Sequence, residues 1–125
     1  MIATFQYYEF YDSKPTPKHI EDFESIALAG ATIVSGSQSH FPQGMGFYGD
    51  SAFIHYGLGN LFFDQMDIPG WGTRREFIDR HVFYEGKHIS TELFSAMLED
   101  FARPRPMTSE EREVFLETLF KASGW

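Results

Sequence analysis

The sequence predicts a mixed α/β (α+β) fold, in which helices pack against a mixed β-sheet. The first 35 residues alternate strand, helix and strand, which is the pattern of a right-handed βαβ unit. Two turn pairs, Gly49-Asp50 and Glu85-Gly86, each separate stretches rich in β-branched and aromatic residues. These pairs predict two hairpins. A last helix with its own capping signal closes the chain.

The βαβ unit begins at residues 2–8, IATFQYY, whose β-branched and aromatic side chains are typical of a buried strand. Thr16 and Pro17 form a helix-start signal, because Thr caps the first turn and Pro is favoured at the first helical position. Gly30 is a natural C-terminal stop. Before it, apolar residues recur at helical spacing at Ile20, Phe23, Ile26 and Ala27. Residues 31–35 predict the second strand.

The loop after this strand, residues 36–43, is the predicted site, because ligands of open α/β sheets usually bind at the carboxyl ends of strands. Residues 44–57 form the first hairpin. Then "LGNLFFDQ" predicts a short helical turn and "MDIPGWGT" a loop. After the second hairpin, "ARPRPM" predicts a proline-rich linker. Thr108 and Glu111 make a capping box that opens the last helix, whose packed face is Phe115, Leu116, Leu119 and Phe120.

The length of 125 residues suits one domain. We divide it into residues 1–65, the βαβ unit and first hairpin, residues 66–103, the second hairpin, and residues 104–125, the C-terminal helix. The chain has 18 Asp and Glu against 10 Lys and Arg, a formal net charge of −8. This acidic balance argues against nucleic-acid and anionic-membrane partners, whose phosphates need basic side chains.

The absence of cysteine excludes disulfides, thiolate nucleophiles and Cys-ligated zinc. No apolar run approaches the roughly 20 residues of a membrane-spanning helix. The N-terminus also lacks the basic and apolar regions of a signal peptide. The composition therefore predicts a chain without a membrane segment and leaves its compartment open.

The segment "AGATIVSGSQSHFPQGMGFYGDSAFIHYGLGNLFFDQ" resembles the CapA/PgsA family of bacterial capsule and poly-γ-glutamate synthesis proteins. This family belongs to the calcineurin-like metallophosphoesterase superfamily. Shared features are the helix-ending Ala-Gly-Ala, the Gly36 turn, His40, Gln43 and the "GLGNLFFDQ" after the hairpin. Upstream, "IATFQYYEFYDSKPTPKH" also resembles the family, so the likeness covers roughly residues 2–65. It implies the C-terminal portion of a two-sheet sandwich covered by helices.

The resemblance also shows which metal ligands differ. The superfamily builds a two-metal site from five sequence blocks, and this chain holds counterparts of only the last two. Gln6 and Gln38 stand where the family has His, Ser37 replaces a neighbouring His, and only His40 is kept. An amide oxygen is a weak ligand beside imidazole or carboxylate. The resemblance therefore implies a degenerate site with His40 as the one metal ligand, no cofactor in this chain, and a divalent metal only in a complete parent protein.

Two interpretations of this edge stay open. Gln6, Gln38 and His40 could line a pocket for a small anion or sugar, or they could be satisfied amides beside a loop histidine. Glu9 matches a family Glu and is, with His40, the weak catalytic candidate. Ser37 and Ser39 have no carboxylate nearby in sequence to orient His40, so nucleophilic catalysis is poorly indicated. The remaining pocket candidates are Gln43 and Asn60, and Asn60 also suits fixing its own turn.

Other residues have simpler interpretations. We expect His55 to be a half-buried structural histidine. His81 and His88 flank the second hairpin turn, where they form either a cross-strand metal pair or, more simply, surface histidines. Trp71 lies in a loop and could act as a lid over the pocket or belong to an interface.

The sequence therefore predicts a CapA/PgsA-like protein of capsule or poly-γ-glutamate biosynthesis that is not a competent enzyme alone. One alternative is a non-catalytic module that binds a polyanionic polymer or a sugar. The other is a phosphoesterase-type hydrolase completed by N-terminal sequence or another chain. The abrupt start at Met1 predicts an uncovered sheet edge, and hence a homodimer that buries the first strand or the aromatics Phe5, Tyr7, Phe53 and Phe62.

Overall fold

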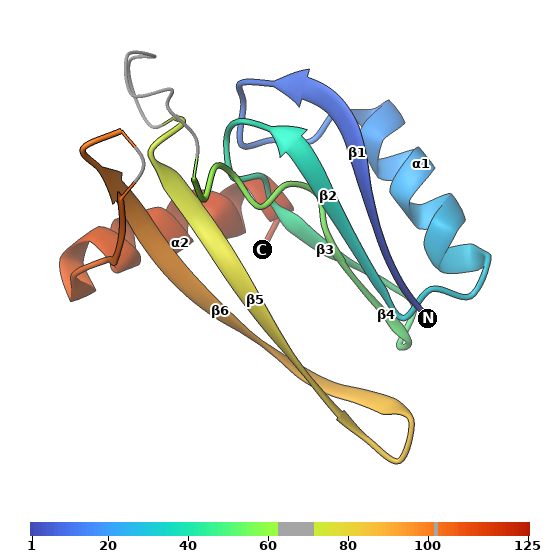
Figure 1. Ribbon diagram of the computed structural model, residues 1–125. Coiled ribbons are helices and arrows are strands. Elements are labelled where there is room, and N and C mark those ends of the chain that lie inside the picture. The colour runs from blue at the N-terminus through green and yellow to red at the C-terminus, as the bar shows by residue number, and fades with distance from the viewer. Residues whose placement is uncertain (63–71, 102) are drawn as a thin grey trace.

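The computed structural model describes residues 1–62, 72–101 and 103–125. It contains two β-sheets and two helices, which confirms the predicted α+β class (Figure 1). The four-stranded sheet has the order β1-β2-β4-β3 and the three-stranded sheet the order β5-β6-β7. The elements are β1 (Ile2–Phe10), α1 (Pro17–Leu28), β2 (Ile33–Ser39), β3 (Met45–Tyr48), β4 (Ala52–His55), β5 (Arg75–Tyr84), β6 (Lys87–Glu99), β7 (Arg103–Pro106) and α2 (Ser109–Ser123).

The four-stranded sheet is mixed. β1 pairs parallel with β2, β2 pairs parallel with β4, and the β3–β4 hairpin is antiparallel. α1 connects β1 to β2, so the predicted βαβ unit is confirmed. The second sheet is antiparallel throughout. Its long β5–β6 hairpin reaches past the end of the four-stranded sheet (Figure 1).

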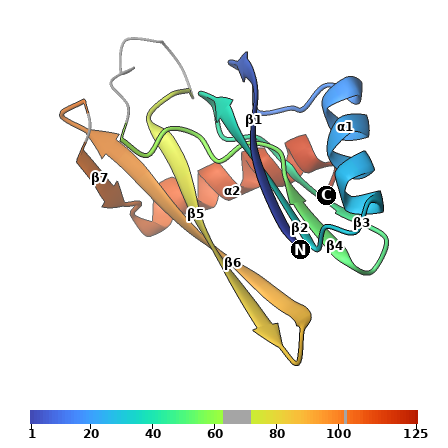
Figure 2. The same ribbon diagram turned by 45° about the vertical axis from the view of Figure 1, so that its right-hand side comes forward.

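Two apolar clusters hold these layers together, and the alternation of side chains along β2 assigns its residues to them. Val34 faces α1, where Phe23 lies fully buried. The preceding residue, Ile33, faces the second sheet and α2. There Phe77 of β5 stacks on Phe115 of α2 with ring centroids 4.6 Å apart. Figure 2 shows α2 running behind both sheets, and its buried Phe115 makes it part of the core that joins them.

The local signals for helix ends and turns are confirmed. Thr16 caps α1, its side chain accepting from the His19 N–H at 3.2 Å. Thr108 and Glu111 form the reciprocal capping box of α2. Both residues of the Glu85-Gly86 turn have positive φ, which is the conformation of a tight two-residue hairpin turn.

Three predictions about connections are wrong. β2 continues to Ser39, so residues 36–39 are strand and not loop, because they pair with the end of β1. The predicted proline linker contains β7, which pairs with the end of β6. Proline is tolerated there because β7 is an edge strand of this sheet. In the described part of the helical turn predicted for residues 58–65, residues 58–62 are not helical, since Leu58 and Gly59 form isolated bridges to Pro42 and Glu76. Residues 63–65 of that turn, and residues 66–71 of the loop predicted after it, lie outside the described residues.

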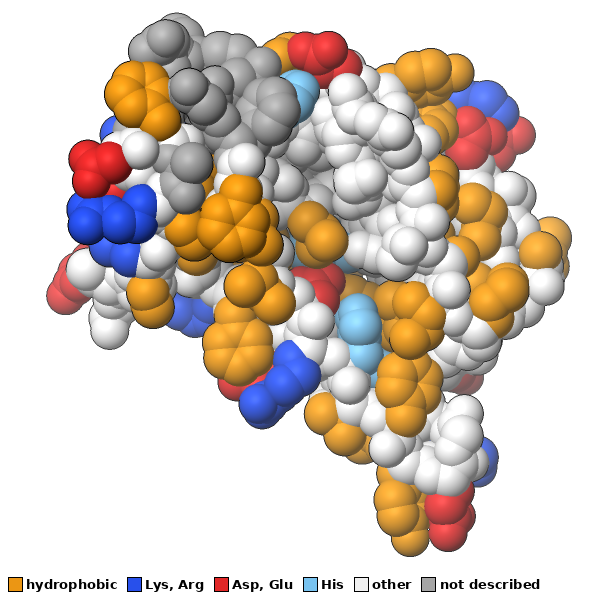
Figure 3. Space-filling model, in the orientation of Figure 1, with side chains coloured by type: hydrophobic (Ala, Val, Ile, Leu, Met, Phe, Trp, Pro, Cys, Tyr) orange, Lys and Arg blue, Asp and Glu red, His pale blue; other side chains and the backbone are white. Residues whose placement is uncertain are grey.

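The predicted aromatic surface is also largely wrong. Phe53 is a core residue, only 4% exposed, and Phe5 and Tyr7 lie half-buried in the cluster under α1. Phe62 is exposed as expected. Trp71 lies outside the described residues. Exposed apolar side chains instead gather over the β5–β6 hairpin (Figure 3), where Ile78, Val82, Tyr84 and Phe94 are exposed.

Among the described residues, the two helices are too short and too polar to cross a membrane.

Candidate functional site

The candidate residues lie toward the carboxyl ends of the parallel strands β1 and β2. Gln6 is the register partner of Ser37, and after a bulge Phe10 is the partner of Ser39. The His40 N–H then donates to the Phe10 carbonyl at 3.1 Å. This pairing sets His40 beside Glu9, with 3.7 Å between the His40 Nε2 and the Glu9 carboxylate. We call Gln6, Glu9, Gln38 and His40 the β1–β2 edge site.

His40 is held in one orientation from behind. Its ring is largely buried, and Nδ1 lies 2.9 Å from the Asn60 Oδ1. Asn60 in turn donates from Nδ2 to the Thr73 carbonyl at 3.2 Å, which fixes its amide oxygen toward His40. With this amide oxygen as the acceptor, Nδ1 donates to Asn60, and Nε2 lies on the side of Glu9. Asn60 does more than fix a turn, because it also sets the histidine tautomer.

Tyr11 contacts both His40 and Glu9. Its ring stacks on His40 with centroids 5.4 Å apart and planes 25° apart. The Tyr11 hydroxyl donates to Glu9. Glu9 is about half exposed and His40 about one-tenth. A solvent-facing carboxylate thus leads to a buried imidazole, and the two can share a proton or hydrogen-bond one ligand.

The two glutamines lie side by side at this edge. Gln6 donates from Nε2 to the Gln38 Oε1. Gln38 has φ of 78°, a left-handed conformation that is uncommon for a residue with a Cβ. Backbone strain of this kind concentrates at functional sites because the surroundings must support it. The side chain of Gln6 is exposed, so this amide pair is open to a ligand from solvent.

The remaining predicted site residues serve the backbone. Ser37 Oγ donates to the Phe5 carbonyl at 3.3 Å, and Ser39 Oγ to the Phe41 carbonyl at 2.7 Å. Gln43 is fully buried and donates to the Asp12 carbonyl at 3.2 Å. A Cβ on Gly57 would stand 2.0 Å from the Ser39 Oγ, so this packing requires glycine there. Ser39 and Gln43 therefore lie behind the site and do not line it.

A second polar group lies between the two sheets. His55 is fully buried and not half-buried as predicted, and its Nδ1 is 2.6 Å from the Asp79 Oδ2. His81 and His88 lie on the neighbouring strands β5 and β6, with the His81 Nδ1 2.8 Å and the His88 Nε2 2.9 Å from the Thr91 hydroxyl. Burial lowers the pKa of His81. Both rings are partly exposed.

Sequence reasoning missed three residues. Tyr11 carries no local signal, because its role depends on the return of the chain at His40. Asp79 does carry one, since it alternates with Phe77 and His81 on an inward strand face. Glu76 is fully buried with neither carboxyl oxygen hydrogen-bonded in the described part of the chain. Burial raises its pKa to about 8.

Within residues 1–62, 72–101 and 103–125, no group of three or more His, Asp or Glu side chains is placed to hold a metal ion. The donors closest to that role at the β1–β2 edge site are one imidazole and one carboxylate.

Comparison with known proteins places the chain among bacterial capsule synthesis proteins. A family model described as "Bacterial capsule synthesis protein PGA_cap" matches residues 1–65, just over half of the chain and all of the candidate site. A curated relative, the capsule biosynthesis protein CapA of Bacillus anthracis, is 28% identical over 111 residues. The aligned region is 87% of this chain and 25% of the relative, so the chain spans about a quarter of the relative's length.

Proposed function

Because the chain belongs to the PGA_cap family of bacterial capsule synthesis proteins, we propose that it acts in capsule biosynthesis through the β1–β2 edge site. The site lies wholly inside the matched residues. Its ligand is a repeating unit of the capsule polymer, either poly-γ-glutamate or a polysaccharide.

One observation carries this proposal: Asn60 holds His40 so that Nε2 faces Glu9 at an open strand edge. A buried, oriented imidazole beside an exposed carboxylate offers one proton acceptor and one charged acceptor to a ligand. The Gln6–Gln38 pair adds amide groups that can both donate and accept. Such a surface matches the amide groups of a γ-linked peptide or the hydroxyl groups of a sugar.

We propose further that this edge is a degenerate metal site. One imidazole and one carboxylate remain, and the two amides are bonded to each other. Neutral amides are poor substitutes for the anionic and imidazole ligands that hold a pair of divalent ions. The chain alone then binds its ligand without hydrolysing a phosphoester.

A metal-dependent hydrolase completed by further sequence or another chain is the second candidate. The Asn60 bond favours it, because metal-binding histidines usually donate their other ring N–H to an outer partner. The chain also spans only a quarter of its relative, which leaves room for other ligands to come from elsewhere.

Binding by the ¹⁵N-labelled chain tests the first proposal. A γ-linked glutamate oligomer and a neutral saccharide oligomer are titrated separately, and one is expected to shift the NMR signals of Gln6, Gln38 and His40. Gln38→Ala and His40→Ala are expected to weaken binding about tenfold, the effect of losing about 1.4 kcal/mol. His81→Ala removes an imidazole from the other sheet and leaves binding unchanged. The proposal is wrong if neither probe shifts these signals or if His40→Ala binds like wild type.

The role in the cell has its own test. In the organism that encodes the chain, His40→Ala is expected to lower the amount of surface polymer at constant protein level, and His81→Ala to leave it unchanged. Equal polymer in both strains would contradict a role for the β1–β2 edge site.

We also propose that the chain forms a homodimer through β1, which is an edge strand of the four-stranded sheet. Ile2 and Tyr8 on this strand are 55% and 71% exposed. Exposed edge strands favour pairing between chains, and a twofold dimer closes that contact. Light scattering is expected to give twice the 14.4 kDa chain mass, and Tyr8→Asp to give the monomer. Leu28→Asp, at an exposed position on α1, is the control. A wild-type monomer would refute this interface.

A further inference from the structure

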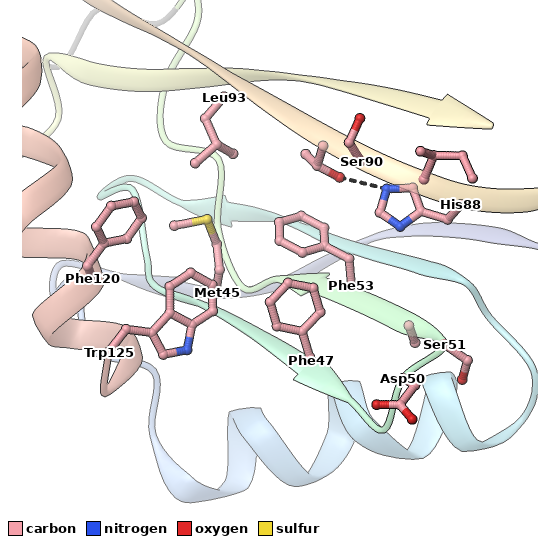
Figure 4. Close-up of a pocket in the computed structure, with 13 residues that line it drawn as sticks. Met45, Phe47, Asp50, Ser51, Phe53, His88, Ser90, Leu93, Phe120 and Trp125 are labelled. Atoms are coloured by element: carbon pink, nitrogen blue, oxygen red, sulfur yellow. Dashed lines mark hydrogen bonds between the residues drawn. The ribbon is translucent and has the colours of Figure 1, made fainter. Parts of the chain in front are cut away.

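A pocket of about 370 Å³ opens between the β3–β4 hairpin, β6 and the end of α2, remote from the β1–β2 edge site. Its size is near the lower end of the range of roughly 300–1,000 Å³ typical of small-molecule sites. Figure 4 shows side chains from all three elements turned into this space.

One end of the pocket is aromatic. Trp125 stacks on Phe47 with centroids 5.6 Å apart and planes 16° apart, and Phe47 packs edge-on against Phe53. Phe53 is buried, whereas Phe47 and Trp125 are 61% and 53% exposed. These two rings stack on each other and are partly open to solvent, so the stack presents an apolar surface to a ligand.

The other end of the pocket is polar. Asp50 and Ser51 of the hairpin turn lie across the pocket from His88 and Thr91 of β6. His88 is oriented by its bond of 2.9 Å to the Thr91 hydroxyl. No Lys or Arg occurs among the described lining residues, and the chain as a whole has a net charge of −8. The pocket therefore disfavours anions such as phosphate or polyglutamate.

We propose that this pocket binds a neutral saccharide unit of one or two rings. A pyranose ring has an apolar C–H face and a rim of hydroxyl groups, and the pocket offers a matching surface to each. The C–H face stacks on Trp125 and Phe47. The hydroxyl groups donate to the Asp50 carboxylate, a charge-assisted hydrogen bond, and exchange hydrogen bonds with Ser51. This site is separate from the β1–β2 edge site and does not depend on the function proposed for it.

Fluorescence of Trp125 tests the proposal, in a Trp71→Phe background so that one indole reports. The probes are neutral di- and trisaccharides of glucose, galactose and N-acetylglucosamine, with a γ-linked glutamate trimer as the anionic comparison. At least one saccharide is expected to give a saturable change and the glutamate trimer none. In the same background, ¹H–¹⁵N NMR follows the backbone signals of Ser51 and Ser90 for variants that lack the indole.

Phe47→Ala and Trp125→Ala are expected to weaken saccharide binding at least about tenfold, and Asp50→Asn about three- to tenfold. Tyr84→Ala removes an exposed aromatic ring outside the pocket and leaves binding unchanged. His40→Ala also leaves it unchanged, which separates this result from the edge-site experiment. The proposal is overturned if no saccharide changes the Trp125 signal at concentrations up to about 10 mM or if the glutamate trimer changes that signal as much. It is also overturned if the folded Phe47→Ala and Asp50→Asn variants both bind saccharide like wild type.

Discussion

Glu76 makes the stability of this protein depend on pH in a direction opposite to that of most carboxylates. Burial without a hydrogen-bond partner in the described chain raises its pKa from 4.5 to about 8. Between these values the folded chain holds the proton and the unfolded chain releases it. Stability is therefore greatest below the unfolded pKa and falls as the pH rises through the folded pKa.

The size of the effect follows from the shift. A difference of about 3.5 pKa units, at about 1.4 kcal/mol each, corresponds to at most about 5 kcal/mol between pH 4.5 and 8. Glu76→Gln keeps the shape and removes the titration. The amide introduced by Glu76→Gln is also buried without a partner, which lowers the free energy of unfolding by about 1–3 kcal/mol. This cost is the same at every pH, so it does not change how the difference between variant and wild type depends on pH. The free energy of unfolding of Glu76→Gln, relative to that of wild type, is thus expected to rise by about 1.4 kcal/mol for each pH unit from 5 to 8.

Urea unfolding at pH 5, 6, 7 and 8, followed by circular dichroism, measures this difference in the free energy of unfolding. Glu117→Gln is the control. Its exposed carboxylate pairs with Lys121 at 2.8 Å, which lowers the pKa of Glu117. The stabilisation by the ionised Glu117 is therefore fully present above the ordinary carboxyl pKa. The difference in free energy of unfolding between Glu117→Gln and wild type is expected to stay constant from pH 5 to 8. A flat difference for Glu76→Gln as well would refute the reasoning.

Three further predictions concern the β1–β2 edge site and its support. The purified chain is expected to carry no stoichiometric transition metal and to show no turnover of an aryl phosphate. Elemental analysis giving about one metal per chain, lost in His40→Ala, would contradict this. Asn60→Ala is expected to lower the free energy of unfolding by about 1–3 kcal/mol, because the His40 Nδ1 and Thr73 carbonyl lose this partner; urea midpoints unchanged from wild type would argue against it. Gly57→Ala is expected to cost about 1–3 kcal/mol through the clash with Ser39, and a thermal midpoint equal to wild type would show that the site relaxes.

The regular elements with local signals could be predicted from the sequence. Thr16-Pro17 and the Thr108–Glu111 box begin the two helices, and the two turn pairs form the hairpins. The lengths of strands with distant partners could not be predicted. β2 runs to Ser39 because its last residues pair with β1. β7 forms, despite its two prolines, because it pairs with the end of β6.

The sequence by itself determined the family, the α+β class and the strand edge along which Gln6, Gln38 and His40 lie. Only the tertiary structure decided which other side chains lie at that edge and which are buried behind it. Asn60 orients His40 from 20 residues away, and Asp79 reaches His55 from 24 residues away on another sheet. Caps and turns depend on neighbours a few residues apart, so the chain encodes them locally. Hydrogen bonds between sheets depend on packing of the whole molecule, which no short stretch of residues specifies.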